Sequence, residues 1–167
     1  AESVAIGSQA GQISQGQHGI AIGRLAGRTT QGELGIAIGY GAGGSVQGTG
    51  SIAVGDRAGQ VDQGTNCIAI GSRSGGNVNG AGQFSQQTLS VAIGHFCGHT
   101  QQGIAAAGGA GSCVAIGSSC SSTQQGANSI AVGYEAGQSH PARTGSDGIA
   151  EFPAGEQFQI VNSIVLN

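Results

Sequence analysis

Residues 20–39 read IAIGRLAGRTTQGELGIAIG, so this stretch begins and ends with the same quartet. A quartet of the type Val/Ile-Ala-Ile/Val-Gly occurs eight times in the 167 residues, and successive copies begin 16, 16, 16, 16, 23, 23 and 16 residues apart. The copies begin at Val4, Ile20, Ile36, Ile52, Ile68, Val91, Val114 and Ile130. A fixed period this short predicts that each repeat is one turn of a structure that stacks on itself.

The quartet itself has the alternation of a β-strand. Its first and third positions are β-branched, its second is Ala and its fourth is Gly in every copy. A period of two places the first and third side chains on one face and Ala on the other. Gly at the fourth position favours a corner. A second corner is indicated by Gln-Gly at positions 12 and 13 of six repeats, and Asn79-Gly80 takes this place in the fifth.

These features predict an all-β chain that folds as a parallel β-roll, or β-solenoid, of about eight 16-residue coils over residues 1–138. Stacked coils lie about 4.8 Å apart, so equivalent residues form files along the axis. We expect Val and Ile inside, Ala on an outer face and Gln at a corner. Burial of so few large side chains offsets little of the entropy lost on ordering a coil. We therefore expect an oligomer whose interface is the Ala column or the surface beside it.

Composition excludes several classes of partner. The chain has five Lys+Arg against eight Asp+Glu and a net charge of -3. Nucleic acids and acidic membranes both require clustered positive charge, so we expect neither as a partner. The apolar runs are far too short to span a bilayer, so we expect no membrane insertion by this segment.

Four stretches carry a resemblance to a known family. They are Ser3-Val4-Ala5-Ile6-Gly7, Ser51-Ile52-Ala53-Val54-Gly55, Ser90-Val91-Ala92-Ile93-Gly94 and Asn128-Ser129-Ile130-Ala131-Val132-Gly133. They resemble the head repeats of trimeric autotransporter adhesins, the YadA-like heads, over about residues 3–138. Similar repeats occur in trimeric fibre and surface proteins of phages, large viruses and predatory bacteria. The family's usual repeat is shorter than 16 residues and lacks the Gln-Gly corner.

The resemblance implies a left-handed roll and a homotrimer on an extracellular, cell-surface or virion-surface fibre. It also implies a glycan or protein on a host or prey surface as the binding partner. The function that follows is a non-enzymatic surface fibre or adhesin head. The alternatives are a purely structural fibre or coat segment and an ice-binding solenoid, although Thr is too sparse here for the ladders common in ice binders.

The regular spacing is interrupted in the fifth and sixth repeats, each of which gains seven residues. We expect both insertions to follow the second corner, as loops 81–90 and 104–113 on one wall. Loops on a rigid scaffold often bind ligands, so Phe84, Gln86, Gln87 and Thr88 are candidate contact residues. The alternative is a pair of surface insertions without a binding role. Residues 139–167 no longer follow the repeat and are predicted to be either a cap on the last coil or a tip that binds.

Cysteine offers the remaining chemistry. Cys97 and Cys120 occupy position 7 of consecutive coils, which places their Cα atoms about 5 Å apart and within disulfide range. The alternative is a pair of free buried thiols, since Cys packs as a small hydrophobic residue. We expect no metal site and no cofactor. We also expect no enzymatic activity, because the chain has no recognisable catalytic triad and no phosphate-binding motif.

Overall fold

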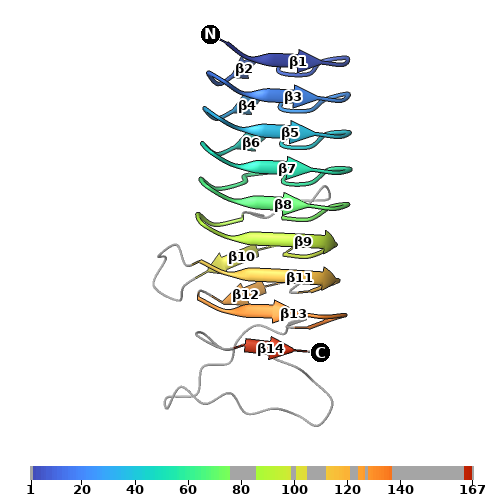
Figure 1. Cartoon of the computed structure of the whole chain (residues 1–167), viewed down its shortest axis with the longest axis vertical. Helices are drawn as coiled ribbons and strands as arrows, with labels where there is room; N and C mark the ends of the chain where they lie inside the picture. The colour runs from blue at the N-terminus through green and yellow to red at the C-terminus, as the bar shows by residue number, and fades with distance from the viewer. Residues whose placement is uncertain are drawn as a thin grey trace.

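The computed structural model describes residues 2–75, 86–98, 101–104, 112–120, 124–126, 128–136 and 164–166. Within these residues every regular element is a β-strand and no helix occurs. Figure 1 shows the strands stacked one above another along a single axis, and neighbouring strands pair in parallel. The predicted all-β solenoid of parallel strands is thus confirmed.

The eight quartets and the strand Ile164–Leu166 form the main wall of the solenoid, a parallel sheet with nine strands among the described residues. In order, these strands are β1 (Val4–Ile6), β3 (Ile20–Ile22), β5 (Ile36–Ile38), β7 (Ile52–Val54), β8 (Ile68–Ile70), β9 (Val91–His95), β11 (Val114–Ser118), β13 (Ile130–Val132) and β14 (Ile164–Leu166). Quartets pair position by position, so Ala5 lies opposite Ala21. This register survives the longer steps, because Ile68 pairs with Val91 and Val91 pairs with Val114.

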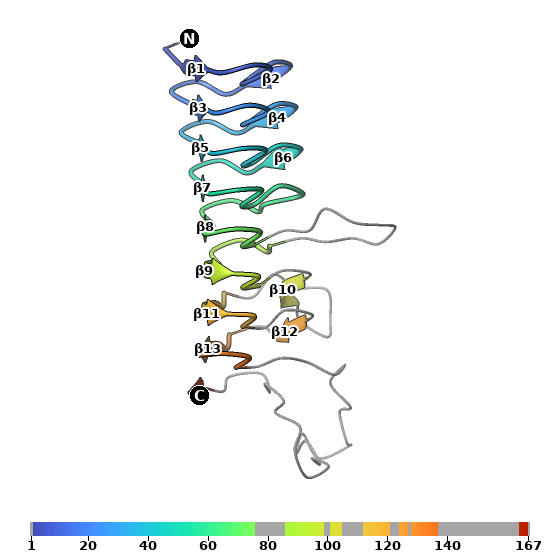
Figure 2. The same cartoon turned by 90° about the vertical axis from the view of Figure 1, so that its right-hand side faces the viewer.

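A second wall lies behind the main sheet, as Figure 2 shows. It contains β2 (Ser14–Gln15), β4 (Thr30–Gln31) and β6 (Val46–Gln47) in one sheet, and β10 (Gln101–Ile104) and β12 (Gln124–Gly126) in another. Isolated parallel bridges from Gln47 to Gln63 and from Gln63 to Gln86 continue the first of these sheets. Backbone hydrogen bonds between successive coils therefore run along both walls, which pairs polar groups that would otherwise be left unsatisfied.

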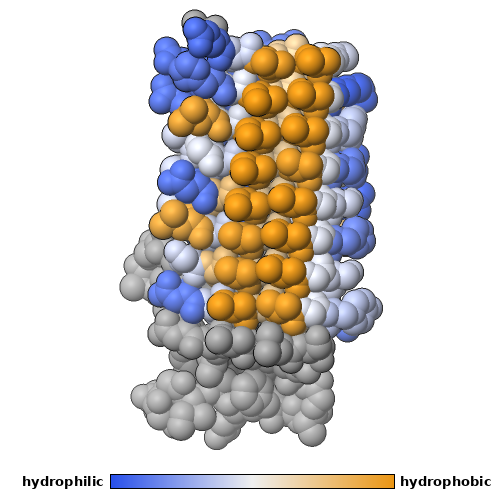
Figure 3. Space-filling view, in the orientation of Figure 1, coloured by the Kyte–Doolittle hydropathy of each residue, from blue (hydrophilic) through white to orange (hydrophobic). Residues whose placement is uncertain are grey.

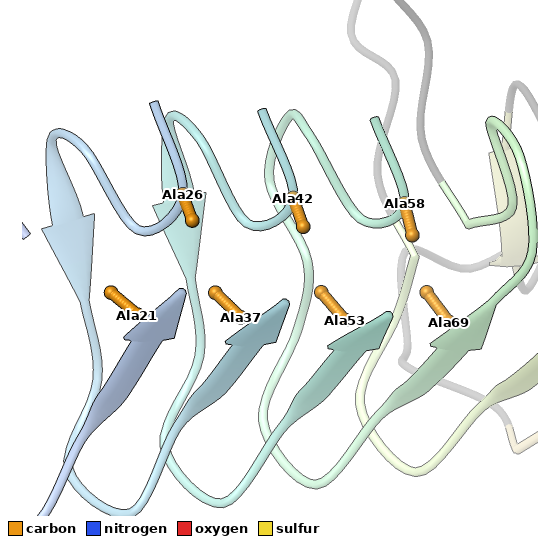
Figure 4. Packing of buried hydrophobic residues seen from close by; sticks show 7 residues of the cluster. All are labelled: Ala21, Ala26, Ala37, Ala42, Ala53, Ala58 and Ala69. Atoms are coloured by element: carbon orange, nitrogen blue, oxygen red, sulfur yellow. The ribbon is translucent and has the colours of Figure 1, made fainter. Parts of the chain in front are cut away.

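The interior is filled by Ala, and the predicted assignment of the two faces of the quartet strand was wrong. The Ala residues at position 2 are fully buried and face those at position 7 of the opposite wall (Figure 4). This cluster is Ala21, Ala26, Ala37, Ala42, Ala53, Ala58 and Ala69. A second cluster continues it with Ala92, Cys97, Ala115, Cys120, Ala131 and Ala136. The two walls leave room for small side chains only, so Val and Ile point outward and the Ala column cannot be an oligomer interface.

The Gln at position 12 also lies inside the coil, although the sequence predicted a corner. Gln31, Gln47, Gln63 and Gln86 are only 1–2% exposed. The Nε2 of Gln47 donates to the carbonyl of Ile36 at 2.7 Å and to that of Ser51 at 3.1 Å. The amide therefore bridges two coils from within and satisfies carbonyls at the start of the main-wall strands, which would be costly to bury unpaired.

Two of the Gly positions that recur in the repeat are required by close approach of neighbouring atoms. Gly23 has φ 120°, and a Cβ there would lie 2.5 Å from the carbonyl oxygen of Gly39 in the next coil. Gly43 has φ 53°, and a Cβ there would lie 2.8 Å from Oε1 of Gln47. Gly at position 4 thus permits tight stacking of the coils, and Gly at position 8 makes room for the buried amide.

The first insertion begins earlier in its coil than predicted. Gln86, not Asn79, is bridged to Gln63 and therefore holds position 12. Ten residues, 76–85, stand where the preceding coil has the three residues 60–62. Residues 86–90, which the sequence assigned to the loop, belong to the coil. In the next repeat Gln102 pairs with Gln125 and the register shifts before Ile104, so the two insertions depart from different points of their coils.

Candidate functional site

The outer face of the main wall is the largest concentration of apolar side chains on the surface that Figure 3 displays. The first and third residues of the quartets form two parallel columns there (Figure 3). We call this surface the apolar face. It consists of Val4, Ile6, Ile20, Ile22, Ile36, Ile38, Ile52, Val54, Ile68, Ile70, Val91, Ile93, Val114, Ile116, Ile130 and Val132. Contiguous apolar surfaces of this kind mark interaction sites.

The exposure of the apolar face follows from the width of the coil. Ile38, Ile70 and Ile116 are each 37% exposed, although each is packed in a column against equivalent residues above and below. β-Branched residues suit a strand, but these strands back onto an interior that admits only Ala. The sequence contained a signal for this arrangement, because position 7 is Ala, Ser or Cys in every repeat. A wall of such small residues can oppose Ala but leaves too little room for Ile.

Two further large side chains extend the apolar surface at the entry to the strands. Leu34 is 60% exposed and Leu89 is 57% exposed, and each lies two residues before the first residue of a quartet. Both have positive φ values, 57° for Leu34 and 64° for Leu89. Exposed Leu in a left-handed backbone conformation is an uncommon combination, and it adds apolar area beside the two columns.

The predicted contact residues do not form a common surface. Gln86 is buried, and its Nε2 donates to the carbonyl of Ile68 at 2.9 Å and to that of Ser90 at 3.0 Å. Its side chain therefore belongs to the interior of the coil. Gln87 and Thr88 are half-exposed at the corner that follows. Phe84 lies outside the described residues, and for Gln87 and Thr88 a binding role stays a prediction.

Cys97 and Cys120 lie in consecutive coils as predicted, and both are free buried thiols. The thiol of Cys97 donates to the carbonyl of Gly117 at 2.7 Å, and that of Cys120 donates to the carbonyl of Gly133 at 2.6 Å. Burial, aided by the neighbouring Cys120, raises the pKa of the Cys97 thiol to about 12. Burial likewise raises the pKa of Cys113 to about 12. Protonated, enclosed thiols are poor nucleophiles, which makes these residues packing elements.

No group of three or more His, Cys, Asp or Glu residues within the described ranges is placed to hold a metal ion. The same ranges contain no helix with the length and apolarity needed to cross a membrane. Comparison with family models, with curated proteins and with solved structures finds no match for this chain.

Proposed function

We propose that three copies of this chain associate through the apolar face to form the non-enzymatic head of an extracellular fibre, on a cell or virion surface, that binds a glycan or protein of a target surface. The observation that carries the proposal is the exposure of two columns of Val and Ile along the main wall. The left-handed winding implied by the resemblance to adhesin heads is part of the same proposal.

The energetics of a single chain support association. Within the described residues, the interior is built from Ala, Cys, Ser and Gln, while the Val and Ile side chains of the quartets face outward. Full burial of a Val or Ile side chain contributes about 1.5–3 kcal/mol, and these residues are already partly covered by their neighbours in the column. A gain of about 1 kcal/mol for each further buried side chain, repeated over both columns, stabilises an assembly strongly.

The geometry of the apolar face favours three copies over two. The main-wall strands that hold only three residues, such as Ile36–Ile38, present two outward side chains, about 7 Å apart. Around a three-fold axis, the column of first-position residues of one copy contacts the column of third-position residues of the next copy. Each copy therefore contacts one neighbour through each of its two columns. Such a ring closes, and its parallel axes keep the coil spacing in step along the whole length.

The mass of the protein in solution tests this proposal. We expect sedimentation or light scattering to give three times the chain mass of 16.1 kDa. Substituting Ile38→Asp and Ile70→Asp together places charges in the centre of the apolar face and should reduce the mass to that of one chain. The matched control is Val46→Asp, because Val46 is also exposed, at 42%, but lies in β6 on the other wall.

A chain that is monomeric before any substitution would contradict the trimer. The binding role is tested separately by presenting the assembled protein to an array of surface glycans. Complete absence of binding would favour the structural fibre or coat segment. Thermal hysteresis from a monomer would instead assign the flat apolar face to ice.

A further inference from the structure

A file of Arg and aromatic residues runs along the corner that follows the main-wall strands. Arg24, Tyr40, Arg57, Arg73 and Phe96 occupy the fifth or sixth position of five consecutive coils, and we call them the arginine file. All five basic residues of the chain are Arg, and three of them lie here. Figure 3 shows a hydrophilic band along the edge of the apolar face at which the strands of Figure 1 end.

The backbone of this corner is tied from coil to coil. The N–H of Gly41 donates to the carbonyl of Arg24 at 2.9 Å, and the N–H of Arg57 donates to that of Tyr40 at 2.7 Å. The N–H of Arg73 continues the series to the carbonyl of Asp56 at 2.8 Å. The side chains of the file therefore project from a backbone whose spacing is fixed at one coil, about 4.8 Å.

The aromatic rings hold the guanidinium groups in place. The Cζ of Arg24, from the coil before, lies 5.7 Å from the centroid of the Tyr40 ring, and the Cζ of Arg57, from the coil after, lies 5.2 Å from it. The Cζ of Arg73 lies 5.3 Å from the centroid of the Phe96 ring. A guanidinium that stacks on a ring uses its planar face for the contact. Its N–H groups point outward in that plane and stay available to hydrogen-bond acceptors.

Little negative charge competes for these donors. Arg57 approaches the carboxylate of Asp56 at 3.7 Å, in a pair whose side chains are 29% and 44% exposed. Such partly solvated pairs contribute little and are readily exchanged. Arg24 and Arg73 form no ion pair within the described part of the chain. Arg24 is exposed, and Arg57 and Arg73 are half-exposed. The Nε of Arg73 is buried and has no hydrogen-bond partner among the described residues.

We propose that the arginine file binds a linear anionic polysaccharide, with its carboxylate or sulfate groups on Arg24, Arg57 and Arg73. The planar guanidinium fork matches these groups in a bidentate arrangement. Arg24 and Arg57 lie two coils apart, about 10 Å, and Arg57 and Arg73 one coil apart, about 4.8 Å. An extended polymer with charges at intervals along its length meets such a row when it lies parallel to the solenoid axis. This site specifies a ligand class for the adhesive head proposed above and so rests on that function.

The aromatic residues favour a polysaccharide over single-stranded nucleic acid. Nucleic-acid grooves use free aromatic faces as platforms for bases. The Tyr40 ring already carries guanidinium groups from two coils. The Phe96 ring contacts Arg73 and meets the His95 ring edge-on at a centroid distance of 4.2 Å. The rings therefore act as positioning residues for Arg rather than as stacking surfaces.

Binding of heparin, measured by calorimetry or interferometry at low salt, tests the site. We expect the full chain to bind heparin, to bind neutral dextran undetectably, and to lose affinity as salt rises. Arg57→Gln should weaken binding about fivefold. The double variant Arg24→Gln with Arg57→Gln should lose more binding free energy than the sum of the two single variants, because both Arg side chains contact the Tyr40 ring. Arg28→Gln is the matched control, because it removes the same charge from an exposed Arg outside the file.

A second variant separates positioning from simple charge. Tyr40→Leu keeps every charge, so long-range attraction predicts no change, whereas loss of the ring should weaken heparin binding about threefold. Tyr40→Phe is the matched control, because it keeps the ring and should retain binding. Circular dichroism and mass must match those of the parent for each variant.

Three results would overturn the inference: no heparin binding by the parent protein, an equal loss from Arg28→Gln, or tighter binding of an oligothymidine that depends on the same Arg residues. Because mass is measured independently, a trimer without heparin binding contradicts only this site. Heparin binding by a monomer contradicts only the proposed assembly.

Discussion

Single methyl groups decide the interior of this protein. Ala53 is completely buried, and the layer around it contains other Ala side chains. Replacing it by Val adds two carbons to a space bounded by two backbone walls, and we expect the free energy of unfolding to fall by about 1–3 kcal/mol. Urea titration measures this change. Val46→Ile, which adds one carbon at an exposed position, should leave the free energy nearly unaltered.

The buried amides make an equally specific demand. Gln47→Glu replaces a group that donates to two carbonyls with one that repels them, and we expect destabilisation of about 3 kcal/mol or more at neutral pH. Burial favours the neutral acid and raises the pKa of the new carboxyl. The difference from the parent should therefore shrink as pH falls from the raised pKa of the folded chain to about 4, the pKa of the unfolded chain, and should level off below that. Gln17→Glu, at an exposed site, should show neither effect.

At the level of the strand, the sequence predicted the period, the corner after the quartet and the parallel register. It did not predict which face lies inward, and it placed at a corner the Gln that the coil buries. Alternation along a strand separates its residues into two faces but does not say which face is buried, since exchanging the two gives the same pattern. The answer came from the opposite wall, where residues such as Ala42 and Cys97 leave no space for Ile. The arginine file was missed for a related reason: Arg24 and Arg57 are 33 residues apart and meet only because the coils stack.

Local sequence also misplaced an insertion. Asn79-Gly80 has the composition of a corner and stands at the expected spacing, so the sequence predicts it at positions 12 and 13. The chain instead places Gln86 there, and its amide donates to the carbonyls of Ile68 and Ser90. An Asn side chain is one carbon shorter than Gln. Spacing alone does not distinguish a residue that turns the chain from one whose side chain extends into the interior.

The buried thiol of Cys97 makes the stability of the fold depend on pH in the alkaline range. The pKa of Cys97 is raised from 9.0 to about 12 in the folded chain. Between these values the unfolded chain loses a proton that the folded chain keeps, so stability falls as pH rises. Replacing Cys97 by Ala, the residue of most other coils at this position, should make this slope shallower. Urea unfolding at about pH 8 and about pH 10 measures it, and identical slopes for parent and variant would disprove the assignment.

At the scale of the whole molecule, each coil contacts chiefly the coils beside it, so stability is distributed along the axis. Deleting residues 36–51 joins Gly35 to Ile52 and removes one coil without altering the register, since Ile36 and Ile52 are equivalent. We expect the shortened chain to give the same circular dichroism per residue and to unfold cooperatively at a lower urea concentration. Deleting only residues 36–43 leaves half a coil and should abolish cooperative unfolding.

Nearly identical coils raise a problem of alignment for the proposed trimer. If one subunit slides by about 4.8 Å, Ile again meets Ile and most of the contact is regained. The subunits therefore need landmarks that occur at one height only. Leu34 and Leu89 are such landmarks beside the columns, as Tyr40 is at the corner. The irregular residues of this chain thus act as index marks that bring its copies into step, and a more perfect repeat would make a less definite assembly.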